Sequence, residues 1–141
     1  VSLRFRVGGT GCGAAINELG DVVGIARTAK DEDHAFYWDG TSMVDIGTLG
    51  GNWSQAESIN NLGYVVGGSF LRLAAPDDRA IEHAFLWKGG RLMDLNDLIP
   101  AGCGWTIEFA HDINDKGQIV GVGARDGRYE AVLLTPQPPQ M

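Results

Sequence analysis

The chain has 141 residues, 21 of them glycine, and a formal net charge of −7. Glycine at roughly twice its ordinary frequency favours tight turns and disfavours long helices. The sequence has no basic stripe for nucleic acid and no apolar run near the ~20 residues of a membrane span. We therefore expect an all-β domain that binds no nucleic acid and is not inserted into a membrane.

A motif that pairs a turn with an apolar strand occurs three times. It reads Ile-Asn-x-x-Gly, followed by a strand that ends in Val-Gly, at residues 16–24, 59–67 and 113–121. Asparagine at the first turn position and glycine three residues later predict a type I turn closed by a glycine with positive φ. The Asn side chain is expected to bond the turn backbone. Each copy therefore predicts two antiparallel strands, which we call strands a and b of a repeat.

Two further motifs follow in order. His-Ala-Phe-x-Trp occupies residues 34–38 and 83–87, with a degenerate copy at 130–134, and predicts strand c. A short apolar segment around an aspartate predicts strand d at residues 43–46 and 92–95. Two-residue turns at Asp39-Gly40 and Lys88-Gly89 would place each histidine opposite an aspartate. The expected pairs are His34 with Asp45 and His83 with Asp94.

Strand c is apolar on both faces, which is typical of stacked blades and not of a sheet with one wet face. We expect one domain over residues 1–135, made of three four-stranded antiparallel repeats in a β-propeller-like arrangement. The repeats span residues 8–51, 52–99 and 100–135, residues 1–7 form an outer strand that closes the last repeat, and 136–141 are a Pro-rich tail. A β-trefoil is the alternative. Three blades do not close a ring, so we expect a homo-oligomer, most simply a dimer.

The three motifs together resemble the HAF family of probable extracellular repeats. The match rests on Ala-Ile-Asn-x-x-Gly-x-Val-Val-Gly, His-Ala-Phe-x-Trp and Asp-Ile-Gly-Thr-Leu-Gly-Gly at residues 45–51. Residues 94–100 and Gly104-Trp105 resemble the last repeat of such proteins. The resemblance implies an extracellular or periplasmic location and the carboxyl-terminal end of a repeat array. It implies no reaction.

The histidine–aspartate pairs are the first candidate site. His34 with Asp45, or His83 with Asp94, has the composition of a general base and its orienting carboxylate. A catalytic group usually occurs once, whereas this pair occurs twice. Repetition favours a structural role in which the pair ties strand c to strand d.

A second candidate is a metal site at the third turn. Residues 112–117 partly match a calcium loop, with Asp112, Asn114 and Asp115 as candidate ligands for Ca²⁺. Lys116 occupies a ligand position, and the other two copies lack an acid at the first position. These departures favour an ordinary turn.

The loops that differ between the copies are candidate functional regions, because binding and catalytic residues often lie on variable loops carried by a rigid scaffold. The segment between strands b and c is longer in the second copy and includes residues 73–79. Trp53 and Trp105 are predicted near such loops and could stack on a sugar or another flat ligand, or pack between blades.

Cys12 and Cys103 could form a disulfide in an exported protein. Glu130 replaces the histidine of the third copy, and Arg4 or Arg6 is its predicted partner.

Two functions fit these residues. The first is an extracellular module that binds a small molecule, protein or glycan without catalysis. The second is a calcium-dependent hydrolase of small esters or lactones, by analogy with calcium-dependent propellers. The sequence leaves open whether the chain is an enzyme.

Overall fold

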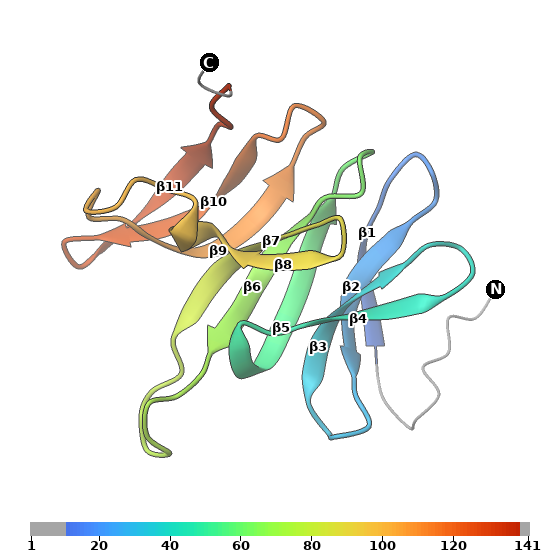
Figure 1. The fold of residues 1–141 in the computed structure, drawn as a ribbon, viewed down its shortest axis with the longest axis horizontal. Helices are drawn as coiled ribbons and strands as arrows, with labels where there is room; N and C mark the ends of the chain where they lie inside the picture. Colours follow the sequence, from blue (N-terminus) through green and yellow to red (C-terminus); the bar gives the residue numbers. More distant parts are fainter. Residues whose placement is uncertain (1–10, 139–141) are drawn as a thin grey trace.

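A computed structural model describes residues 11–138 and is all-β, as predicted. Its strands lie side by side in three antiparallel groups, which we call the first, second and third meanders (Figure 1). The first comprises β1 (Gly11–Ile16), β2 (Val22–Arg27), β3 (Asp33–Trp38) and β4 (Met43–Gly47). The second comprises β5 (Gly50–Ile59), β6 (Val65–Leu71), β7 (Glu82–Lys88) and β8 (Arg91–Asp94), with the 3-10 turn η1 (Leu95–Asp97) after it. The third comprises β9 (Thr106–Ile113), β10 (Ile119–Arg125) and β11 (Arg128–Leu134).

The meanders form a row, not a closed ring or barrel, over the residues that the structure describes (Figure 1). A single parallel pair, Asp33 with Trp53, links β3 of the first meander to β5 of the second. The third meander has three described strands. The outer strand predicted at residues 1–7, with Arg4 and Arg6, lies outside the described residues.

The three a–b turns form as predicted. In each, the glycine N–H donates to the Asn carbonyl, over 3.1 Å at Asn17, 3.2 Å at Asn60 and 3.0 Å at Asn114. Each Asn Oδ1 also accepts two backbone N–H groups of its own turn, from the residues two and four positions later. The closing glycines have φ between 78° and 85°. The sequence therefore determines this turn locally.

The c–d hairpins form with a different register from the one predicted. Trp38 pairs with Met43 and Phe36 with Asp45, so the turn residues are Gly40 and Thr41 and not Asp39 and Gly40. The second hairpin shifts in the same way, with its turn at Gly89-Gly90. Both of these glycines have positive φ, at 59° and 80°, as a type I′ turn requires.

Asp39 explains part of this register. Its carboxylate accepts the backbone N–H groups of Thr41 and Ser42, both at 2.8 Å. These hydrogen bonds, with Ser42 the largest cause and Thr41 next, lower the pKa of Asp39. The aspartate therefore stands before the two turn residues and stabilises them from outside.

The core lies between meanders. One buried cluster joins the first meander to the second and includes Val23, Val65 and Phe85. A second cluster joins the second meander to the third and includes Val66 and Ile119. Neighbouring residues Val65 and Val66 thus point to opposite faces, so the second meander is buried on both sides.

Glycine at the end of the Val-Gly motif has a packing reason. A Cβ atom at Gly67 would overlap the carbonyl oxygen of Gln55 on β5. Gly24 and Gly121 meet the backbone of the neighbouring strand in the same way. The close approach occurs beside a register irregularity in every a–b hairpin.

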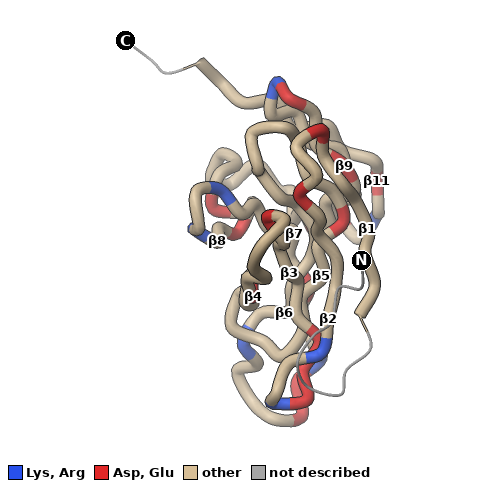
Figure 2. Tube along the Cα trace, turned by 90° about the vertical axis from the view of Figure 1, so that its right-hand side faces the viewer, with Lys and Arg blue, Asp and Glu red and all other residues tan. Residues whose placement is uncertain are grey.

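Charged residues lie mostly in loops and at strand ends, where short Lys and Arg segments stand beside acidic ones (Figure 2). No helix among residues 11–138 is long and apolar enough to cross a membrane.

Candidate functional site

Both predicted histidine–aspartate contacts are present, on β3–β4 and on β7–β8. His34 Nδ1 lies 2.9 and 3.0 Å from the two carboxylate oxygens of Asp45. His83 Nδ1 lies 2.6 Å from Asp94 Oδ2. Because Asp45 stands opposite Phe36, the first histidine reaches its aspartate diagonally across the two strands.

The two aspartates also hold the chain that leaves strand d. Asp45 accepts the N–H of Gly47 at 2.8 Å. Asp94 accepts the N–H of Asn96 at 2.8 Å and caps η1. Each carboxylate thus joins strand c, strand d and the following turn, which is the arrangement expected of a structural pair.

The first pair differs from the second in its surroundings. The Asp45 side chain is 55% exposed, against 15% for Asp94. His34 Nε2 is buried, makes no hydrogen bond within the described chain, and lies 3.6 Å from Glu32 Oε2. The imidazole of His34 therefore has a carboxylate beside each of its ring nitrogens, Asp45 at Nδ1 and Glu32 near Nε2.

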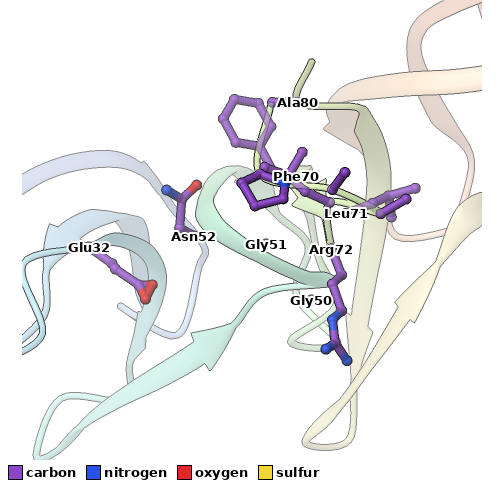
Figure 3. Close-up of a pocket in the computed structure, with 12 residues that line it drawn as sticks. Glu32, Gly50, Gly51, Asn52, Phe70, Leu71, Arg72 and Ala80 are labelled. Atoms are coloured by element: carbon purple, nitrogen blue, oxygen red, sulfur yellow. The ribbon is translucent and has the colours of Figure 1, made fainter. Parts of the chain in front are cut away.

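Glu32 also lines a pocket between the first and second meanders, with a volume of about 440 Å³. Glu32 and Asn52 lie on one side and Phe70, Leu71 and Arg72 on the other (Figure 3). We call this pocket the b–c groove, because the long loop between β6 and β7 supplies much of its apolar wall. That wall includes Leu73, Ala74, Ala75, Pro76 and Ala80.

Two glycines let β5 pass close to the end of β6 at this groove. A Cβ atom at Gly51 would lie 2.7 Å from the Cβ and the carbonyl oxygen of Phe70. Gly50 has φ of 117° and a Cβ there would lie 3.1 Å from Arg72 Cβ. The Gly-Gly pair therefore sets the distance between β5 and Arg72, and with it the shape of the groove.

The acidic residues on either side of Glu32 are paired with one arginine. Arg27 Nε lies 2.8 Å from Asp31 and its Nη1 lies 3.4 Å from Asp33. The hydrogen bond with Asp31 is the largest cause that raises the pKa of Arg27. Arg27 and these two carboxylates do not line the groove, whose charged lining residues are Glu32 and Arg72, of opposite sign.

The two predicted ligand-binding tryptophans have different positions. Trp53 packs on Phe70, with ring centroids 4.8 Å apart, and supports the groove without lining it. Trp105 lies under the Arg125 guanidinium, 4.5 Å from it. Trp105 also lines an apolar pocket of about 350 Å³ with Pro100, Cys103 and β11.

The predicted calcium ligands all contact the second meander. Asp112 accepts a hydrogen bond from Ser58 at 2.5 Å, and Asn114 uses its Oδ1 in its own turn. Asp115 accepts the backbone N–H and the side-chain amide of Asn61, both at 2.8 Å, and these bonds lower its pKa. Over residues 11–138, no group of three or more His, Cys, Asp or Glu side chains is arranged to hold a metal ion. Calcium binding stays a prediction.

The two cysteines are not joined in the structure. Cys12 is an exposed thiol on β1 and Cys103 is a half-buried thiol in the loop before β9. Figure 1 shows β1 at one end of the row and the third meander at the other. The proposed disulfide between them within one chain is therefore not formed, because the repeats separate the two positions.

The sequence pointed to the long loop but not to its polar neighbours. The difference in length between the b–c segments is the signal that pointed to residues 73–79, of which residues 73–76 line the groove. Glu32, Asn52 and Arg72 carry no motif. Asn52 and Arg72 are brought together by the pairing of β5 with β6, and Glu32 joins them from the first meander.

Comparison of the chain with protein-family models, with curated proteins and with solved structures finds no match.

Proposed function

We propose that this chain is a β-propeller-type repeat module that works outside the cytoplasm and binds a partner in the b–c groove. The observation that carries the proposal is the position of the groove. It forms at the loop in which the second repeat departs from the first, while the repeated residues maintain the scaffold. The location outside the cytoplasm is supported by the resemblance to HAF repeats.

The propeller architecture is supported by the way the repeats pack. Each interface between meanders has its own buried cluster of the same kind, and the middle meander is covered on both faces. Blades stacked around an axis bury their sheets in this manner.

The lining suggests the chemistry of the partner. A wall of small apolar side chains and Phe70 would accept an apolar side chain, while Arg72 and Glu32 would bind a carboxylate and an ammonium group. A short peptide segment offers all three groups. Among the predicted partners, we therefore favour a peptide of an extracellular protein over a glycan.

A peptide-library titration followed by NMR tests this proposal. We expect bound peptides to shift the amide signals of Gly50, Gly51 and Asn52, and Arg72→Ala to weaken binding by about tenfold or more. Arg79→Ala is the matched control, because Arg79 lies in the same loop but does not line the groove. Equal loss in both variants, or binding that shifts no groove residue, contradicts the proposal.

The hydrolase stays the alternative function. A calcium titration by calorimetry, followed by assays with ester and lactone substrates with and without a chelator, tests it directly. Chelator-sensitive hydrolysis that is lost in Asp112→Asn would replace the binding module with an enzyme.

A further inference from the structure

The a–b turns of neighbouring meanders are joined by a ladder of hydrogen bonds with a fixed direction. Asn17 Nδ2 donates to the carbonyl of Asn60 at 3.1 Å, and Asn60 Nδ2 donates to the carbonyl of Asn114 at 3.0 Å. One residue later, Glu18 N–H donates to the Asn61 side chain and Asn61 N–H donates to Asp115, both at 2.8 Å. Each meander is thus the donor to the meander that follows it.

The ladder leaves complementary groups at its two ends. At the third meander, Asn114 Nδ2 bonds only Gln118 within the described residues, and the N–H of Asp115 has no partner there. Asn17, by comparison, uses one Nδ2 hydrogen on Asp21 and the other on the next meander. The third meander therefore offers two donors that its predecessors use between repeats.

The first meander offers the matching acceptors. The carbonyl of Asn17 accepts only its own turn glycine within residues 11–138. Glu18 is the counterpart in sequence of Asn61 and Asp115, whose side-chain oxygens accept the backbone N–H of the preceding meander, and it too has side-chain oxygens that can accept. If the pattern continues, Asn114 Nδ2 would meet the Asn17 carbonyl of another chain, and Asp115 N–H would meet its Glu18.

The apolar residues of the first and third meanders are complementary in the same way as these donors and acceptors. Val23 and Val66 face the next meander and are fully buried, whereas their counterpart Val120 is 45% exposed. Ile59 and Ile113 face the preceding meander and are 7% and 6% exposed, whereas their counterpart Ile16 is 68% exposed. Each end thus exposes the side chains that the two internal interfaces bury.

We infer that a second copy of this chain docks head to tail, with the third meander of one chain on the first meander of the other. The contact continues an interface that the chain already builds twice, with donors meeting acceptors and apolar residues meeting apolar residues. It is heterologous, so the two surfaces differ. Two such contacts between two chains would place six meanders in one closed ring. The inference uses no residue of the b–c groove, so it can fail or hold independently of peptide binding.

Sedimentation of the full chain over a range of concentrations tests the inference by complementation. We expect the unmodified chain to associate, and Val120→Glu and Ile16→Lys each to sediment as monomers. An equimolar mixture of the two variants should associate again, since each retains the surface that the other lacks. Ile81→Lys is the control, because Ile81 is an exposed residue of the second meander and should leave association unchanged.

Three outcomes would overturn the inference. They are a monomeric unmodified chain, a single variant that still associates by itself, and a mixture that stays monomeric. Circular dichroism of each variant checks that it is folded. A finer test is Glu18→Lys, which should weaken association by about tenfold, while Glu18→Gln keeps an acceptor and should weaken it less.

Discussion

The a–b turns and the b–c loops lie at opposite ends of the strands and differ in how closely the repeats agree (Figure 1). The three a–b turns have the same asparagine, the same closing glycine and the same hydrogen bonds. The b–c loops range from Asp126-Gly127, both with positive φ, to the ten residues 72–81. The edge that carries the a–b turns therefore joins the repeats. The edge that carries the b–c loops differs from copy to copy and forms the groove.

The largest effect should come from the invariant edge. Gly67→Ala places a Cβ atom on the Gln55 carbonyl, where only backbone movement can relieve the overlap. We expect a loss of about 3 kcal/mol or more in the free energy of unfolding, measured by urea denaturation. Gly13→Ala is the control, because its Cβ would make an ordinary contact of 3.7 Å with Val22. Equal effects of the two substitutions would show that the close approach is not what requires glycine.

Removing an asparagine of the ladder should have the next largest effect. Asn60→Ala removes two turn hydrogen bonds and the bond to the Asn114 carbonyl, and Asn60 is buried. We expect a loss of about 2–3 kcal/mol. Asn114→Ala removes the same turn bonds and an exposed side-chain bond to Gln118, but no bond to another described meander, and should cost less. The comparison is made by urea denaturation at a concentration where the chain is monomeric, and equal losses would argue against the ladder.

The two histidines should differ in the same assay. His83→Ala leaves the half-buried Asp94 without its imidazole partner, and we expect a loss of about 2 kcal/mol. His34→Ala should cost about 1 kcal/mol, because Asp45 is largely solvated. If stability holds in both variants and an enzymatic activity disappears, the pairs are catalytic and the structural interpretation is wrong.

The smallest effect concerns pH. Hydrogen bonds from Asn61 lower the pKa of Asp115 in the folded chain, so the ionised carboxylate favours the folded state. This contribution is complete above the unfolded pKa of about 3.9 and is lost as the pH falls from there through the folded pKa. The stability advantage over Asp115→Asn should therefore shrink below about pH 4. An NMR titration midpoint for Asp115 above 3.9 would contradict this sign.

The sequence was sufficient where structure is local and insufficient where it depends on packing. The a–b turns follow from Asn and Gly at fixed spacing, and they form as expected. The c–d register was wrong because Asp39-Gly40 and Gly40-Thr41 both suit a two-residue turn. One feature that no local pattern reveals is the Ser54 hydroxyl, which accepts the Ala35 N–H and donates to the Gly47 carbonyl between β3 and β4. The groove depends in the same way on contacts between meanders.

The polarity of the asparagine ladder has an evolutionary consequence. Each Asn Nδ2 that crosses to the next repeat donates to a main-chain carbonyl, not to a particular side chain. Every duplicated copy of the unit supplies that acceptor automatically, whatever its other substitutions. Tandem duplication of the gene segment would therefore preserve this part of the junction without compensating mutations, while the loops at the opposite edge diverge from copy to copy.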